Sequence, residues 1–322
     1  MNPHILIHHK IINILQSIAL VFILAGMVSY LSLLIGGQSF AILGFTTVLL
    51  MYILNPGLTP QFILRMYNAQ PLDHVNAPAF VELLAQVAQQ AGLSHLPKLY
   101  YVPSEVINAF TVGSEKNAVI AVSHGLIQKL TYSELAGIFA HEISHIKNKD
   151  IRIMMFADIA GRFTKLLSLF GQLLILVNLP LSLLTDMDIP WWPLFVMIVA
   201  PLLSDLIQLG LSRIREYNAD LGSAMIIGDA RPLISALQKV EYYNHSYMAS
   251  LFMPFRKISE PSLLRTHPMT EERIRRLKEF HQTTEFETNY RKPVNYAHDL
   301  SDKPIEGKKV ESPRRRYTGF WY

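Results

Sequence analysis

Two histidines and a glutamate carry the clearest chemical signal in the chain. His141, Glu142 and His145 lie within residues 131–150, TYSELAGIFAHEISHIKNKD. Residues four apart share one face of a helix, so the two imidazoles would point at one spot in space. That arrangement suits two nitrogen ligands on one Zn²⁺, with Glu142 beside them to take a proton from water. The pattern therefore predicts a zinc site.

A buried helix is needed to hold these side chains. Thr131 and Glu134 form the pattern of a capping box, in which each side chain bonds to the backbone N–H of the other residue. Apolar residues then recur at helical spacing at Leu135, Ile138, Phe139 and Ile143. The segment is thus predicted to be an interior helix with one apolar face. A helix that carries the three polar residues by chance is the alternative.

A third protein ligand must come from elsewhere in the chain. The sequence contains no cysteine, which leaves His, Asp and Glu as ligands and excludes disulfides. Glu216 is the best candidate, and Asp220 lies four residues later on the same helical face, where it could accept from the ring N–H of a zinc histidine. The alternative is a surface helix start on which Arg213 and Arg215 pair with these two carboxylates.

Composition points to a membrane. Half of the 322 residues are hydrophobic, and only 17% are charged. The net charge of +4 is concentrated near apolar segments and in the last twenty residues, which favours a membrane surface over nucleic acid. Four apolar segments could cross a bilayer: 11–35, 40–54, 166–184 and 191–211.

The four segments are paired as two hairpins. A signal peptide is the alternative for the first segment and a buried soluble hairpin for the second pair. Pro180, Pro193 and the Trp191–Trp192 pair favour the membrane for that second pair. Basic residues flank one side of the segments, and the two tight links at 36–39 and 185–190 contain none. The positive-inside rule then predicts that both termini and the metal helix face the cytoplasm.

The rest of the chain reads as a mainly helical fold with a small β-sheet. Asn76 is placed to cap a helix over 79–91 that Gly92 ends. Strands are expected over 98–102, 106–112 and 118–122, a short helix over 123–130 and a last helix over 271–281. Asp205, in the fourth apolar segment, is expected to face the protein interior.

The domain division that follows has five parts. These are an N-terminal transmembrane hairpin, the first part of a catalytic domain, a second transmembrane hairpin, the second part of the catalytic domain and a flexible basic tail: 1–57, 58–165, 166–211, 212–281 and 282–322.

Four short motifs occur along the chain: Asn108–Phe110, His141–His145 with Asn148 and Asp150 after it, Arg215–Asp220, and Thr266–Pro268 with Arg273–Ile274. Together they resemble the HtpX family, which consists of bacterial membrane-embedded zinc endopeptidases related to the CAAX prenyl proteases. The resemblance covers residues 11–277, in the same order and with the same hairpin between the metal motifs. It implies an integral membrane zincin of the gluzincin type.

The resemblance also implies a role for each motif residue: one zinc held by His141, His145 and Glu216; Glu142 as the catalytic base; Asp220 supporting the zinc ligands; His267 and Arg273 stabilising the tetrahedral intermediate; and Asn108, Ala109 and Phe110 lining the substrate cleft. The residues alone leave alternatives open. The strand could be an ordinary core strand, His267 a helix cap and Arg273 a surface charge. Thr111–Val112 replaces the smaller residues usual there, which could narrow the cleft.

The sequence is therefore interpreted as a membrane-integral zinc endopeptidase. The resemblance implies quality control of misfolded or damaged proteins in a bacterial inner membrane, with membrane-protein or peptide substrates, the bilayer as surroundings and no nucleic-acid partner. A scaffold or chaperone with a structural zinc and a transporter are the alternatives. Glu142 argues against the scaffold, because a structural zinc needs no base. The transporter is disfavoured because Asp205 is the single mid-membrane ionisable candidate in the apolar segments.

Overall fold

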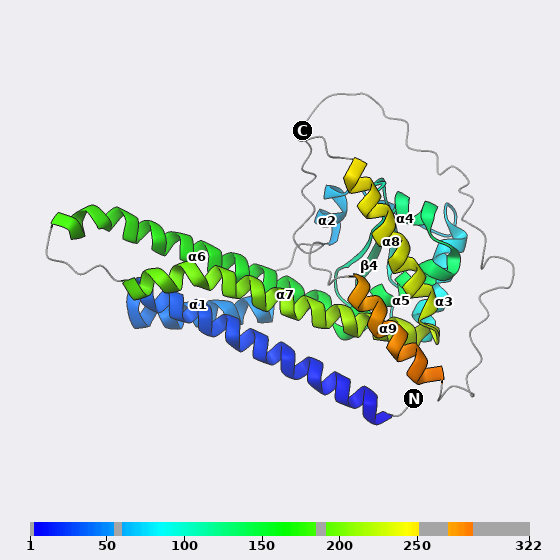
Figure 1. Ribbon diagram of the computed structural model, residues 1–322, viewed down its shortest axis with the longest axis horizontal. Helices are drawn as coiled ribbons and strands as arrows, with labels where there is room; N and C mark the ends of the chain where they lie inside the picture. Colours follow the sequence, from blue (N-terminus) through cyan, green and yellow to red (C-terminus); the bar gives the residue numbers. More distant parts are fainter. Residues whose placement is uncertain (1–2, 55–59, 185–190, 251–269, 286–322) are drawn as a thin grey trace.

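An elongated helical bundle projects from a region that holds the sheet and the remaining helices (Figure 1). The computed structural model describes residues 3–54, 60–184, 191–250 and 270–285. The bundle consists of α1 (Pro3–Leu54), α6 (Asp150–Leu184) and α7 (Trp191–Ile227). The expectation of a mainly helical fold with a small sheet is confirmed for the described residues.

The sheet has the strand order β1-β2-β4-β3. The strands are β1 (Gln70–Leu72), β2 (Lys98–Val102), β3 (Ala109–Val112) and β4 (Val119–Ser123). The β2–β4 pair is parallel, and the two outer pairs are antiparallel. β3 therefore forms one edge of the sheet. The strand predicted from residue 106 was too long. The N–H groups of Val106 and Asn108 bond to the hydroxyls of Ser104 and Ser123 instead of to backbone carbonyls of a neighbouring strand.

Side chains that alternate between the two faces of the sheet contribute to two separate hydrophobic cores. Ile120 and Val122 of β4 pack in the main core, with helices α3 (Pro78–Ala91), α5 (Tyr132–Asn148), α8 (Arg231–Ser250) and α9 (Thr270–Glu285). Val119 and Ala121 face the other way, toward α2 (Pro60–Met66). This period-two burial of apolar side chains holds the sheet against α5, the helix with the two histidines.

Two of the expected helix ends differ in detail. Asn76 does not cap α3; its side chain accepts from the Asp73 N–H and donates to the Pro71 carbonyl in the preceding turn. The end of α3 is confirmed, because Gly92 adopts φ of +69°, a conformation that favours glycine. The short helix α4 (His124–Lys129) is capped by the Ser123 hydroxyl, and α9 extends four residues beyond the expected end.

Three helices of the described residues are long and apolar enough to cross a membrane: Ile18–Ile53, Asp150–Val177 and Trp191–Ile227. The first of them reverses at Gly36–Gly37, where Gly37 has φ of +76° and ψ of −163°. The Ser29 hydroxyl donates to the Ala41 carbonyl across this reversal at 2.9 Å. α1 is thus a tight hairpin, and four helical segments form the bundle, as the apolar pattern predicts.

Both helices of the second hairpin continue out of the bundle. α6 and α7 run unbroken through residues 165 and 211, where the sequence suggested domain boundaries; the division itself remains a prediction. The expectation for Asp205 was wrong. Its side chain is 45% exposed and lies 2.8 Å from the Lys165 ammonium on α6. The ion pair with Lys165 holds the carboxylate on the outer face of the two helices.

Candidate metal centre

The two histidines of α5 lie one helical turn apart in the middle of the main core. The Thr131–Glu134 capping box that starts α5 is present as expected. His141 and His145 are 4% and 9% exposed, and their rings are perpendicular with centroids 4.8 Å apart. Their Nε2 atoms approach to 3.2 Å. One buried helix therefore aims two ring nitrogens at one point.

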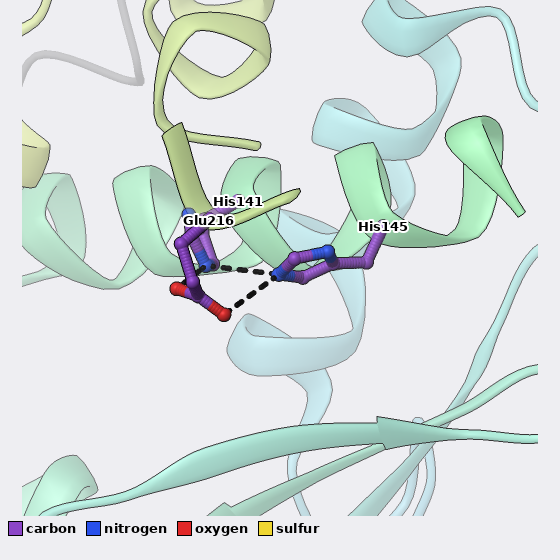
Figure 2. Close-up of side chains that lie close together, drawn as sticks. All are labelled: His141, His145 and Glu216. Atoms are coloured by element: carbon purple, nitrogen blue, oxygen red, sulfur yellow. Dashed lines mark hydrogen bonds and ion pairs between the residues drawn. The ribbon is translucent and has the colours of Figure 1, made fainter. Parts of the chain in front are cut away.

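Glu216 of α7 completes the cluster (Figure 2). Its Oε2 lies 3.4 Å from His141 Nε2, and its Oε1 lies 3.5 Å from His145 Nε2. The three ligand atoms all lie within 4.8 Å of one another. Two ligands of one tetrahedral zinc, each bound at about 2.0–2.1 Å, are separated by roughly 3.3 Å. The spacing of the three side chains fits a shared zinc ion.

The outer nitrogen of each ring meets a carboxylate. His141 Nδ1 lies 3.0 Å from Asp220 Oδ1, and His145 Nδ1 lies 3.0 Å from Asp150 Oδ2. An ionised carboxylate only accepts hydrogen bonds, so Nδ1 is the protonated atom in each neutral ring. Both Nε2 lone pairs then face each other and the Glu216 carboxylate. A metal cation between them would accept both lone pairs and the carboxylate.

The charges of the buried residues lead to the same conclusion. Four carboxylates and two guanidiniums are buried around the histidines: Asp150, Glu142, Glu216, Asp220, Arg215 and Arg273. With neutral imidazoles this set has a formal charge of minus two, which a divalent cation balances. Burial lowers the pKa of His145, but hydrogen bonds to Asp150 and Glu216 outweigh it and raise the pKa well above 6.5. Burial also lowers the pKa of His141, but hydrogen bonds to Asp220 and Glu216 outweigh it and raise that pKa above 6.5. The centre attracts positive charge.

Arg273 of α9 closes the centre from a third helix. Its Nε and Nη2 donate to the two oxygens of Asp220 at 2.8 and 2.6 Å, and its Nη1 lies 3.2 Å from Glu216 Oε2. Its guanidinium is buried, so Arg273 is not a surface charge. Burial opposes its charged form, but Asp220 and Glu216 raise the pKa of Arg273 above its usual value. Arg273 therefore fixes the carboxylate behind His141.

Glu142 lies beside the two histidines on α5 and is 8% exposed. Its Oε2 accepts a hydrogen bond of 2.6 Å from the hydroxyl of Thr111 on β3. Ala109 packs with the main core on the same side. The Phe110 ring instead lies on the other face of β3, with its centroid 5.0 Å from that of Tyr67. Phe110 can therefore line a cleft at this centre only through its backbone. His267 lies outside the described residues.

The comparisons with known proteins agree with this geometry. The model of peptidase family M48 matches residues 76–281. The chain belongs to peptidase family M48. Curated relatives of this M48 chain include protease HtpX homologs of Campylobacter concisus (33% identical, covering 77% of this chain and 90% of the relative), Persephonella marina (34%, 82% and 96%) and Pyrococcus furiosus (36%, 79% and 91%). The M48 chain is thus an HtpX-like membrane metalloprotease, and zinc is its metal.

Solved structures similar to the M48 chain include the crystal structure of S. mikatae Ste24p. The match has a TM-score of 0.44 and 20% identity. It covers 83% of this chain and 65% of that one, which is less than two thirds of the solved protein.

Three residues of the M48 centre were not assigned by sequence reasoning. Asp150 supports His145, and Arg215 Nη1 donates to the other oxygen of Asp150 at 3.0 Å. Arg215 and Glu216 are both buried, which excludes the alternative of a surface ion pair between them. Thr111, which bonds Glu142, is the third. The signal for Asp150 was an acid five residues after His145, at the start of the next helix.

Proposed function

We propose that this protein is a zinc endopeptidase in which His141, His145 and Glu216 hold the metal and Glu142 is the general base. The observation that carries the proposal is the convergence of two ring nitrogens of α5 and one carboxylate of α7, with each ring held by a further carboxylate. Zinc bound there would polarise a scissile carbonyl and make water acidic near neutral pH.

The side chains of the chain supply the other steps. Glu142 accepts the proton of the attacking water and passes it to the leaving amine. Asp220 and Asp150 keep the imidazoles in the tautomer whose Nε2 is unprotonated. Arg273, together with His267, is proposed as a donor to the oxygen that becomes negative in the tetrahedral intermediate. For Arg273, its position next to Glu216 supports this role.

The substrate backbone is proposed to add to the edge of the sheet at β3. Residues Asn108, Ala109 and Phe110 would then present their main chain to an extended peptide. Two observations support this. β3 is an outer strand among the described strands, and its side chains on one face reach the helix that carries Glu142.

The proposal places the protein in a bacterial inner membrane with the metal centre and both termini on the cytoplasmic side, where it removes misfolded or damaged membrane proteins. The basic residues around the spans support the orientation. The ends of the hairpins also agree. Trp192 at the start of α7 donates to Tyr30, near the α1 reversal, whereas Arg152 at the start of α6 donates to Tyr52 near the end of α1. The α1 reversal and the start of α7 therefore lie at the end of the bundle away from the metal centre.

Two substitutions test the assignment. Glu142→Ala should retain one zinc per chain and lose cleavage of an unfolded polypeptide by about 100-fold or more, because a positioned base contributes on that scale. Glu216→Ala should lose zinc in metal analysis of detergent-purified protein. Glu82→Ala, at an exposed glutamate of α3, is the matched control and should do neither.

Normal cleavage by Glu142→Ala would reject the catalytic role, and unchanged zinc in Glu216→Ala would reject the ligand role. Proteomic comparison of membranes that contain active protein or Glu142→Ala then identifies substrates. Damaged membrane proteins should accumulate with the inactive variant.

A further inference from the structure

Thr111 connects the outer strand of the sheet to the proposed base. Its hydroxyl donates to Glu142 Oε2 at 2.6 Å, although the two residues are 31 positions apart in the sequence. Glu142 is 8% exposed, Thr111 is partly buried, and one partner of the bond is a carboxylate. Such charge-assisted hydrogen bonds are shorter and stronger than neutral ones.

The register of β3 places the backbone of Thr111 at the outer edge of the sheet. The Ser123 N–H donates to the Asn108 carbonyl, and Thr111 is opposite Ile120 in the antiparallel pair. Residues of an antiparallel strand alternate between bonding to the partner strand and facing away from it. Because Asn108 faces β4, Ala109 and Thr111 direct their backbone groups to the outer edge, where none of the described strands pairs with β3.

Thr111 thus has its backbone at the edge where a substrate strand would add, and its side chain is hydrogen-bonded to Glu142, the proposed base. A glutamate has three side-chain torsions, and an untethered carboxylate would sample several positions near the two histidines. The Thr111 hydroxyl engages one carboxylate oxygen and leaves the other for a water molecule. Holding a catalytic group in one orientation lowers the entropic part of the barrier.

Strand formation does not explain the hydroxyl. Valine has nearly the same shape as threonine and is also enriched in strands. The bond to Glu142 gives the hydroxyl a role that valine could not fill.

We infer that Thr111 is a positioning residue, whose hydroxyl orients Glu142 and couples it to the strand edge that receives the peptide. The inference rests on the proposed function, in which Glu142 is the base.

The test compares Thr111→Val with Thr111→Ser in detergent-purified, zinc-loaded protein. Thr111→Val should lower kcat about 10-fold or more, the scale of one hydrogen bond to a charged group, while KM changes by less than about twofold. Thr111→Ser keeps the hydroxyl and should restore most of kcat. Zinc content should be one per chain in both variants.

A second measurement does not depend on activity. Thermal unfolding of wild type, Thr111→Val, Glu142→Ala and the double variant forms a double-mutant cycle. If the hydrogen bond exists, the loss of Tm caused by Thr111→Val should be clearly smaller when Glu142 is already alanine.

Other results would overturn the inference. Unchanged kcat in Thr111→Val, a rise in KM alone, failure of serine to restore kcat, or additive Tm changes would each show that Thr111 does not position the base. The failure of the proposed function looks different. There, Glu142→Ala itself would still cleave, whatever the behaviour of the Thr111 variants.

Discussion

Asp150 shows how single side chains set the properties of the metal centre. One of its oxygens lies 3.0 Å from His145 Nδ1, and the other accepts from Arg215 at the same distance. Asp150 and Arg215 are 0% and 1% exposed, so each compensates the buried charge of the other. Replacing either one would leave the partner's charge buried and disturb the ring of His145.

Asp150→Asn keeps the shape of the side chain and removes the charge. Because an amide can also donate, the His145 tautomer is no longer fixed, and zinc affinity should fall about 10- to 100-fold. A competition titration with a chelator measures the affinity. Asp158→Asn, two turns further along α6 and paired with Arg162 on the surface, is the control. Equal zinc affinity in the two variants would contradict the role of Asp150.

The three residues of the candidate metal cluster were more predictable than the residues that support them. His141 and His145 follow from helical spacing alone, and Glu216 follows from the chemistry of open zinc sites without cysteine. Asp150 and Arg215 depend on how α6 and α7 pack against α5, which no local pattern encodes. Asp220 was expected to support a zinc histidine, and the structure shows which ring it contacts, His141.

At the scale of elements, Glu134 joins the start of α5 to α8. Besides the capping box, its carboxylate accepts from Ser235 and from Lys239 at 2.6 and 2.8 Å. Burial opposes the charged form, but the bonds from Lys239, Ser235 and the Thr131 backbone outweigh it and lower the pKa of Glu134 below 4.5.

This lowered pKa predicts a pH-dependent stability. In the folded protein Glu134 stays ionised at pH values where the unfolded chain takes up the proton. Its contribution is therefore complete above pH 4.5 and is lost as the pH falls through the folded pKa. Glu134→Gln preserves the capping box and should lower Tm by a few degrees at neutral pH, with the difference from wild type shrinking in acid. Lys239→Gln should show the same profile. A difference that grows on acidification would contradict this.

Helix α8 was overlooked in the sequence, although its signal was present. Its apolar residues Leu233, Leu237 and Val240 recur at helical spacing and pack in the main core. The close approach to α5 was not predictable: a Cβ added at Gly137 would come within 2.9 Å of the Leu233 backbone nitrogen. The strand predicted over 106–112 shows a limit of sequence patterns. Serine hydroxyls accept from the N–H groups of Val106 and Asn108, and no pattern of apolar residues predicts that.

At the scale of the whole molecule, the orientation of the bundle in the membrane is the main prediction. The chain has no cysteine, so an introduced one gives a unique label. With a membrane-impermeant maleimide, Gln38→Cys in the α1 reversal should be labelled from outside intact cells. Glu82→Cys on α3 should be labelled only after the membrane is opened. The opposite pattern would show that the metal centre faces outward.

The four apolar segments made the bundle predictable, and the glycine pair marked its reversal. What could not be predicted was the continuity of α6 and α7, because a change from apolar to polar composition resembles a domain boundary even when the helix does not end. The basic tail was predicted over 282–322, but its first four residues continue α9 to Glu285. Residues 286–322 and His267 lie outside the described residues, and their roles remain predictions.

The unbroken course of α7 has a mechanical consequence. The helix that begins at Trp191 in the apolar bundle also carries Glu216 to the ring nitrogens. If α7 slid along its axis by the rise of one residue, about 1.5 Å, the carboxylate would leave bonding range of a metal held by the two imidazoles. The grip on the metal therefore depends on how α7 is seated against its neighbours in the bundle, far from the centre itself.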